Sequence, residues 1–167
     1  MRKWLCDAKV YLSVFGDKSC LLRQKLLCRF SVKPINDQKD LIRKFIKEAS
    51  FSNSPYSIDN ARELISEIDE EILQQIFNQA LVRNESNVDF WDILIGGIVR
   101  SQMSIENKLG QLDKLLNSEI IIIREVALAA LAKLAYNGSK EAVSRLEHLQ
   151  DLALQEEVKR ILIDLSK

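Results

Sequence analysis

The sequence has few of the residues that make tight turns and few that bind metals. Its 167 residues include only five glycines and two prolines. All-β folds need many tight turns, which these two residue types supply, so the composition argues against an all-β fold and favours a helical one. The only histidine, His148, has no cysteine or second histidine near it in the sequence. A single such residue makes no metal site, and we expect neither a metal ion nor a cofactor.

Cysteine is also scarce, and long apolar runs are absent. The three cysteines (Cys6, Cys20 and Cys28) are odd in number, and their spacings of 14 and 8 match no zinc or redox motif. We expect reduced thiols, as in the cytoplasm. No run of 18 apolar residues is present, so no membrane span is predicted. Asp7 and Lys9 interrupt the first apolar stretch, which argues against a signal peptide. The sequence therefore predicts a cytoplasmic protein.

The charges are balanced overall but separated along the chain. Lysine and arginine total 24, and aspartate and glutamate total 24. Residues 1–50 hold 12 basic and 5 acidic side chains, a net charge of +7, whereas residues 51–93 hold 2 and 9, a net charge of −7. The chain as a whole is therefore not basic enough to indicate a nucleic-acid-binding protein, but its charges are separated into a basic N-terminal part and an acidic middle part.

Apolar residues recur every three or four positions along most of the chain, which predicts an all-α protein. The expected helices cover residues 3–15, 18–30, 38–49, 58–67, 70–83, 89–101, 104–116, 119–136, 140–150 and 153–166. Short polar residues at their starts are expected to cap them: Asn36 or Asp37, Ser57, Asp69, Ser104, Ser118 and Ser139. Asn137-Gly138 is typical of a helix C-terminus, since both residues tolerate a left-handed backbone.

A polar stretch at residues 51–56 (Phe-Ser-Asn-Ser-Pro-Tyr) is the best linker, and the charge changes sign there. We expect residues 1–50 to form a basic helical N-terminal segment and residues 57–167 a separate helical array.

Helical hairpins repeat within that array. Three helices carry the same apolar stripe at sequence offsets of 33 and 31: Phe90, Leu94, Gly97, Ile98 and Ser101; Ile123, Ala127, Ala130, Leu131 and Leu134; Leu154, Val158, Ile161, Leu162 and Leu165. The helices between them agree at an offset of 34: Leu109, Leu112 and Leu115 correspond to Val143, Leu146 and Leu149. Repeated hairpins of this length indicate an α-solenoid, in which stacking buries the apolar face that each hairpin leaves open.

The second copy, at residues 123–134, resembles a HEAT repeat. Its Ile123-Arg124 pair, two small residues (Ala127 and Ala130) and two leucines follow the pattern of that family. In such a repeat the small residues let helices approach closely, and the arginine can bond the preceding turn. The match is best over residues 119–165. The first copy has Trp91 in place of the arginine, and the third has Gln155. An irregular helical bundle is the alternative.

The helix at 89–101 differs from the others because its apolar residues cover nearly all sides, so we expect it to be central and buried. Gly96 and Gly97 each lower its helix propensity by roughly 1 kcal/mol. We expect a neighbouring helix to pack closely there. The last helix carries Lys159, Arg160 and Asp164, which suit the polar outer side of a terminal repeat.

Stacked hairpins present an extended surface, so the leading functional hypothesis is a non-enzymatic scaffold that binds a protein partner. If the second helix of each hairpin lines that surface, opposite-face spacing predicts these exposed partner-binding residues: Gln75, Asn78, Asn107, Gln111, Lys114, Glu141, Arg145 and His148.

Two alternatives remain. The basic N-terminal helices could bind nucleic acid or another anionic partner through Arg2, Lys3, Lys9, Lys18, Arg23, Lys25 and Arg29, a set that Arg43, Lys44 and Lys47 extend. The resemblance also extends to HEAT-like subunits of bilin lyases and to alkylation-repair glycosylases, although no residues here match either chemistry. An acidic cluster (Glu63, Glu67, Asp69, Glu70 and Glu71) is interpreted as a solvated face or as a site for a basic partner.

Overall fold

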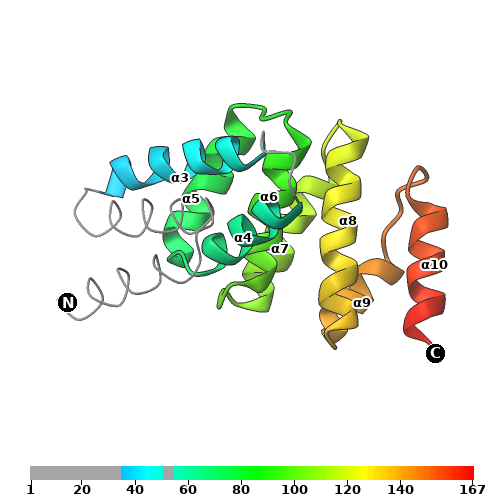
Figure 1. The fold of residues 1–167 in the computed structure, drawn as a ribbon. Helices are drawn as coiled ribbons and strands as arrows, with labels where there is room; N and C mark the ends of the chain where they lie inside the picture. The colour runs from blue at the N-terminus through cyan, green and yellow to red at the C-terminus, as the bar shows by residue number, and fades with distance from the viewer. Residues whose placement is uncertain (1–34, 51–54) are drawn as a thin grey trace.

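The computed structural model describes residues 35–50 and 55–167. In this part of the chain all regular structure is helical, which confirms the all-α prediction, and there is no strand (Figure 1). The helices are α3 (Ile35–Ser50), α4 (Pro55–Ser66), α5 (Glu70–Val82), α6 (Val88–Arg100), α7 (Ile105–Leu116), α8 (Ile121–Tyr136), α9 (Lys140–Glu147) and α10 (Gln155–Leu165). None of these described helices is both long and apolar enough to cross a membrane. The helices expected at 3–15 and 18–30 lie outside the described residues.

Three of the expected N-caps are confirmed. The side chains of Asp69, Ser104 and Ser139 accept hydrogen bonds from backbone amides in the first turns of α5, α7 and α9. The break at Asp69 therefore separates two helices, as predicted. Asn137 and Gly138 end α8, and Gly138 adopts a φ of +90°. That left-handed backbone explains the glycine.

The other expected caps are wrong. Asn36 and Asp37 lie inside α3. Ser57 lies inside α4, which begins at Pro55, since proline fits the first turn of a helix and lacks only an amide hydrogen that would have no partner there. The linker expected at 51–56 is thus already helical at its last two residues. Ser118 lies too early in the chain, because Ile120 is the N-cap of α8.

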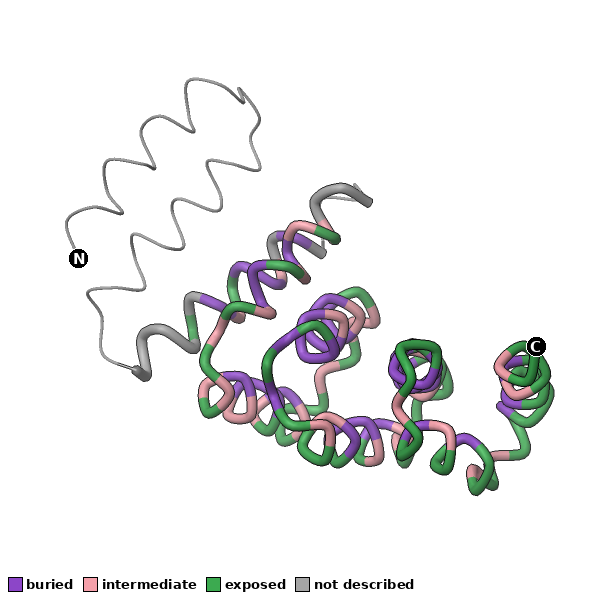
Figure 2. Tube along the Cα trace, turned by 90° about the horizontal axis from the view of Figure 1, so that it is seen from below, coloured by how far each residue is buried: buried purple, intermediate pink, exposed green. Residues whose placement is uncertain are grey.

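The helix α6 is central, as its apolar surface predicts. It packs against α4 and against α8, and α3 also contacts it. Phe90, Trp91, Ile93 and Leu94 of α6 are at most 1% exposed. The rings of Phe77 from α5 and of Phe90 both meet Trp91 edge-on, with centroids 5.5 and 5.8 Å away. Figure 2 shows in purple how buried positions recur along the helices of the described chain.

The two glycines of α6 lie where α4 comes closest. A Cβ atom on Gly97 would be 2.3 Å from Cγ2 of Ile65, and one on Gly96 would be 2.7 Å from the Arg62 side chain. The predicted close helix contact is therefore confirmed. Two ion pairs fasten the same two helices: Arg62 with Asp92, and Arg100 with Asp59.

Burial follows the stripes found in the sequence. Every stripe residue of α6 and α8 is buried, and so are Leu154, Val158 and Ile161 of the third copy. The last two residues of that copy, Leu162 and Leu165, are half-buried, because among the described helices only α8 and α9 pack against α10 to any extent. Figures 1 and 2 show α8 and α10 side by side.

The loops before α6, α8 and α10 repeat one local turn at a constant interval. Side-chain oxygens of Glu85, Ser118 and Asp151 each accept a hydrogen bond from the backbone amide two residues later, at 3.4, 3.2 and 2.9 Å. Such bonds hold the chain in a turn. The three turns lie 33 residues apart; α6 and α8 each begin three residues after theirs, and α10 begins four residues after its own.

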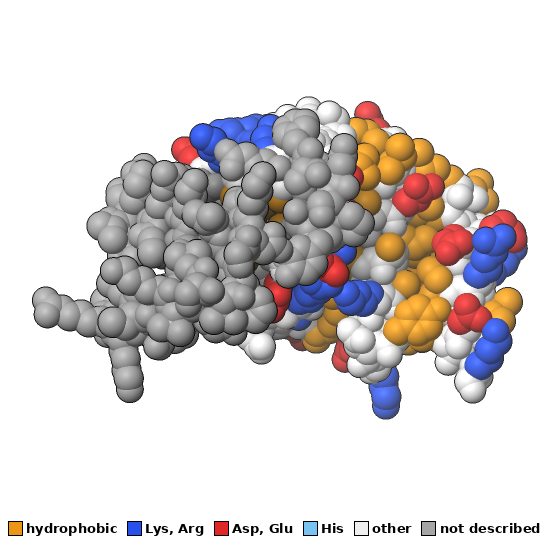
Figure 3. Space-filling view, in the orientation of Figure 1, with side chains coloured by type: hydrophobic (Ala, Val, Ile, Leu, Met, Phe, Trp, Pro, Cys, Tyr) orange, Lys and Arg blue, Asp and Glu red, His pale blue; other side chains and the backbone are white. Residues whose placement is uncertain are grey.

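Large apolar side chains that stay exposed gather on a few elements. They are Val82, Ile120, Ile121, Ile122, Tyr136, Leu152 and Ile163. Four of them belong to α8 or its N-cap. Figure 3 shows hydrophobic side chains over α8 and α10 on the face turned to the viewer.

Candidate interaction surface

The predicted partner-binding residues lie on α5, α7 and α9 or at their ends. Six of them are exposed and Gln75 is half-buried: the exposed ones are Asn78, Asn107, Lys114, Glu141, Arg145 and His148. We refer to the exposed side of these three helices as the α5–α7–α9 face.

The prediction was wrong for Gln111, because its side chain is buried and the residue is only 5% exposed. It lies between Leu109 and Leu112 on the buried side of α7, and its Nε2 atom is 3.7 Å from the sulfur of Met103. Opposite-face spacing placed it outward, but α7 buries a wider arc than a single stripe. Its Oε1 atom is buried and has no hydrogen-bond partner.

Polar side chains of this face connect successive hairpins. Asn107 of α7 donates a hydrogen bond to Glu70 of α5. Lys114 lies 3.4 Å from Oδ1 of Asn78, and its ammonium group is 5.9 Å from the centre of the Phe77 ring. These contacts hold α7 beside α5 and position the side chains of the face.

The same pattern continues to α9. Arg145 of α9 pairs with Asp113 of α7. The remaining predicted residues bond within their own elements: Gln75 to Glu71 at 3.1 Å, Glu141 to the Ser139 hydroxyl at 3.0 Å, and His148 Nδ1 to the carbonyl of Ser144 at 2.7 Å. Hydrogen bonds from its own backbone amide and from Ser139 lower the pKa of Glu141.

An open hollow of about 790 Å³ lies at one end of this face, where α7 and α9 finish. Its apolar lining comes from Leu116, Leu149 and Leu152. Its polar lining includes two arginine–aspartate pairs, Arg145–Asp113 and Arg124–Asp151.

Arg124 joins three elements in that hollow. Its Nη1 atom donates to the carbonyl of Ser118 at 2.9 Å, which confirms the expected bond to the preceding turn. Its Nε atom lies 2.8 Å from Oδ2 of Asp151 in the α9–α10 loop. Sequence reasoning singled out both arginines of the hollow but neither aspartate. The two partners of each pair lie 32 and 27 residues apart in the sequence, and no local pattern connects them.

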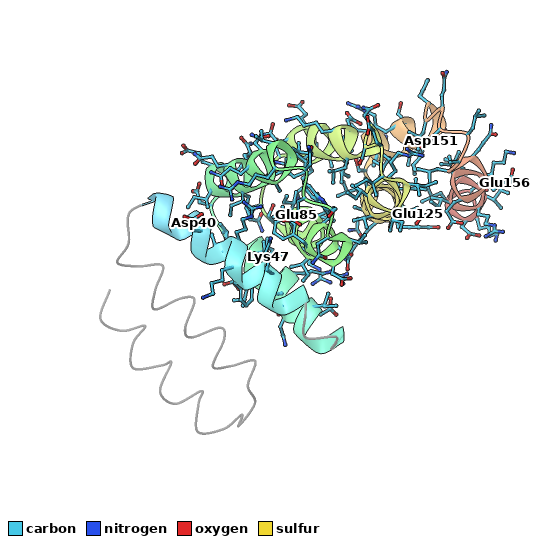
Figure 4. All side chains as sticks on the ribbon, turned by 90° about the horizontal axis from the view of Figure 1, so that it is seen from above. Asp40, Lys47, Glu85, Glu125, Asp151 and Glu156 are labelled. Carbon is cyan, nitrogen blue, oxygen red and sulfur yellow. The ribbon has the colours of Figure 1, made fainter. Side chains whose placement is uncertain are left out.

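A second group of charges joins α3 to the rest of the array. Glu85, with a side chain only 11% exposed, accepts from Arg43 at 3.4 Å and pairs with Lys47 at 3.2 Å (Figure 4). Burial alone would raise the pKa of Glu85, but bonds from Lys47, the Asn87 amide and Arg43 lower it overall. Two cations of the extended basic set therefore bind a carboxylate of the same chain.

The acidic cluster also has local partners. Asp69 caps α5, and Glu70 accepts bonds from Gln74 and Asn107. Asp59, which precedes the cluster, has a lowered pKa because Arg100 and Arg62 donate hydrogen bonds to it. In the described part of the chain no group of three His, Cys, Asp or Glu residues is arranged to hold a metal ion.

The alternative anion-binding residues Arg2, Lys3, Lys9, Lys18, Arg23, Lys25 and Arg29 lie outside the described residues, as do the three cysteines. No family model, curated protein or solved structure matches the chain. Its function is therefore argued from the geometry of the α5–α7–α9 face and its hollow.

Proposed function

We propose that the protein is a cytoplasmic, non-enzymatic scaffold, a short HEAT-like α-solenoid that binds a protein partner on the α5–α7–α9 face. Its repeated turns support the solenoid interpretation, because Glu85, Ser118 and Asp151 recur at equal spacing in the sequence with the same hydrogen bond. The contacts of α6 with α4 and α8, and of α8 with α10, are those expected of one row of first helices. Hydrogen bonds and an ion pair join α5 to α7 and α7 to α9 in a second row.

The observation that carries the proposal is the bridging of exposed side chains between hairpins. Lys114 and Arg145 are held by residues of the neighbouring helix, so the face presents charges at defined positions. A surface that is ordered before binding loses less conformational entropy when a partner binds. Exposed ion pairs contribute little to the free energy of folding. These contacts therefore matter because they fix the positions of the charged side chains.

The hollow beside Arg124 and Arg145 suggests how a partner would be anchored. Leu152 is 87% exposed and borders the hollow together with Leu116 and Leu149. An apolar side chain of the partner would lie against these leucines, and its backbone or polar groups would bond the two arginine–aspartate pairs. Protein interfaces commonly combine such an apolar centre with a polar rim.

The test is site-specific photo-crosslinking in cells with the full chain. A crosslinking residue at Asn78, Lys114 or His148 should capture the same partner, and one at Lys159 on α10, which is also exposed, should not. Alanine substitutions at the first three positions should then weaken the purified complex by about tenfold or more for at least one of them, as at interface hot spots. Equal capture from Lys159, or a loss of affinity spread evenly over both surfaces, would contradict the proposal.

A further inference from the structure

The outward side of α8 is not the polar surface expected of an exposed helix. Residues Ile122, Glu125, Ala129, Lys133 and Tyr136 are all exposed and lie within one narrow stripe at spacings of three and four residues, which we call the outer α8 stripe. Ile122 is 48% and Tyr136 is 53% exposed. The view in Figure 4 runs along α8 and shows Glu125 on the side away from α9.

The helix α8 resembles α6 in being apolar around most of its circumference, but only α6 is covered on nearly all sides. A helix that is apolar all round is normally buried in a protein core. In α8 the inner residues pack against α6, α7, α9 and α10, and the outer stripe has no cover among the described residues. The two large apolar side chains that the stripe leaves exposed, Ile122 and Tyr136, lie at its two ends, where a second surface lying along α8 would cover both.

In either direction from Ala129, the stripe has first a charged residue and then a large apolar one, and the two charges have opposite signs. Glu125 and Lys133 lie four residues on either side of Ala129, and Ile122 and Tyr136 lie seven residues on either side. Two copies of α8 crossing antiparallel at Ala129 would place Glu125 opposite Lys133 of the second copy, and the reverse. Ile122 would face Tyr136 in the same way, and the small alanine would let the two helices approach closely.

The two charges of the stripe are available for such pairing. Neither Glu125 nor Lys133 has an ion pair with another described residue, whereas Lys159 and Arg160 of α10 pair within their helix. Eight residues of helix separate the two charges by about 12 Å along the axis, too far for them to pair with each other. A second copy supplies the opposite charge to both at once.

We propose that the outer α8 stripe binds a second copy of the chain in an antiparallel two-fold dimer with Ala129 on the axis. A two-fold contact uses one patch on both subunits and therefore requires self-complementarity, which the stripe has. The stripe is separate from the α5–α7–α9 face, so a dimer would leave the proposed partner surface open. Because a single pair of crossing helices buries less than the ~800 Å² per subunit of a stable interface, we expect a reversible dimer with a micromolar dissociation constant.

Charge reversal followed by mixing tests the proposal. E125K places a lysine opposite Lys133 of the second copy, and K133E places a glutamate opposite Glu125, so each variant should dissociate at least about tenfold more readily than the natural chain. An equimolar mixture of E125K and K133E should form a heterodimer, because one facing pair of the mixed dimer joins the two natural charges and the other joins the two reversed ones. Every facing pair is likewise opposite in charge in a dimer of the double variant E125K/K133E, which should therefore also recover dimerisation. Sedimentation velocity measures all five samples: the natural chain, the two single variants, their mixture and the double variant.

Two further variants control for folding and for general apolar association. L152S removes the large apolar side chain that is most exposed among the described residues; it lies at the hollow and outside the outer α8 stripe, so dimerisation should be unchanged. A129R introduces a charge and bulk on the axis and should abolish the dimer, and circular dichroism should show unchanged helix content. A natural chain that is monomeric up to about 1 mM, or a double variant E125K/K133E no more dimeric than the two single variants, would overturn the proposal.

Discussion

Trp91 of α6 and Arg124 of α8 make the same hydrogen bond at the start of their helices. The indole Nε1 of Trp91 donates to the carbonyl of Glu85 at 2.7 Å, and Nη1 of Arg124 donates to the carbonyl of Ser118 at 2.9 Å. Each bond reaches back six residues to the loop before its helix, and the two donors lie 33 residues apart in the sequence. Two chemically different side chains therefore close the same turn, so the tryptophan that departs from the sequence pattern keeps the bonding role of the arginine.

This role predicts the effect of removing the arginine. Arg124→Met loses the bond to Ser118 and leaves Asp151, which is 18% exposed, without its cation. We expect the free energy of unfolding to fall by about 2–3 kcal/mol, since partly buried charged groups are costly to leave unpaired. Urea denaturation measures the change.

A double variant and a control sharpen that test. Arg124→Met together with Asp151→Asn should cost less than the sum of the two single changes, because both remove one interaction. Arg160→Met, which breaks an exposed pair on α10, should change stability by less than about 0.5 kcal/mol. If the effects of Arg124→Met and Asp151→Asn on the free energy of unfolding were additive, Arg124 and Asp151 would act independently.

The close contact of α4 and α6 predicts opposite effects of two glycine substitutions. Gly97→Ala should destabilise the protein by about 2 kcal/mol or more although alanine favours helices, since its Cβ atom would collide with Ile65. Gly110→Ala, on the exposed side of α7 with nothing within 4 Å, should stabilise by up to about 1 kcal/mol. Thermal unfolding measures the change in stability of both variants. A stabilising Gly97→Ala would contradict the close packing of α4 against α6.

The charge group around Glu85 predicts a pH dependence of stability. The pKa of Glu85 is lowered in the folded protein from its usual 4.5, so its contribution is full above about that pH. The contribution is lost as the pH falls through the lower folded-state pKa, where the native carboxylate takes up its proton. Glu85→Gln should therefore cost about 1–3 kcal/mol at pH 7 and progressively less below pH ~4.5.

Asp59 provides the comparison for that prediction, because it also has a lowered pKa but a side chain that is 62% exposed. Solvent screens its pairs with Arg62 and Arg100, so Asp59→Asn should have a much smaller effect at pH 7. Unfolding in guanidinium chloride at several pH values measures both. A loss for Glu85→Gln that is constant between pH 7 and pH 3 would argue against ionic pairing.

The burial of Gln111 predicts a stabilising substitution. Gln111→Leu removes a buried oxygen that has no hydrogen-bond partner and keeps the side-chain volume close to its present value, so we expect a gain of about 1 kcal/mol. Gln111→Ala should instead destabilise, since it leaves a cavity. If both substitutions lowered the melting temperature, the side-chain amide of Gln111 would make a stabilising interaction.

The sequence predicted the helices well because helix formation depends on local spacing. The stripes of α6 and α8 recur every three or four residues, and those positions are buried as expected. Capping was predicted correctly where a polar residue directly precedes the helix, at Asp69, Ser104 and Ser139. It failed at Ser57 because Pro55 begins the helix earlier.

The candidate site was predicted only in part. Opposite-face spacing identified Asn78, Lys114 and Arg145 as exposed, because these lie on the middle of the outer arc. It misplaced Gln111 at the edge of that arc, where a neighbouring element decides whether a side chain is covered. It also missed Asp113 and Asp151, since an aspartate in isolation does not reveal which arginine of another repeat will lie beside it.

By itself, the sequence determined that the described chain is helical, where most helices lie and which stripes form the core. These three properties depend on how apolar and polar residues alternate over a few helical turns, and each segment contains that whole pattern. Only the tertiary structure decided that Gly97 would touch Ile65, that Arg124 would reach Asp151 and that one side of α8 would remain open. Each depends on where a distant helix lies, because an apolar surface does not specify which neighbour covers it.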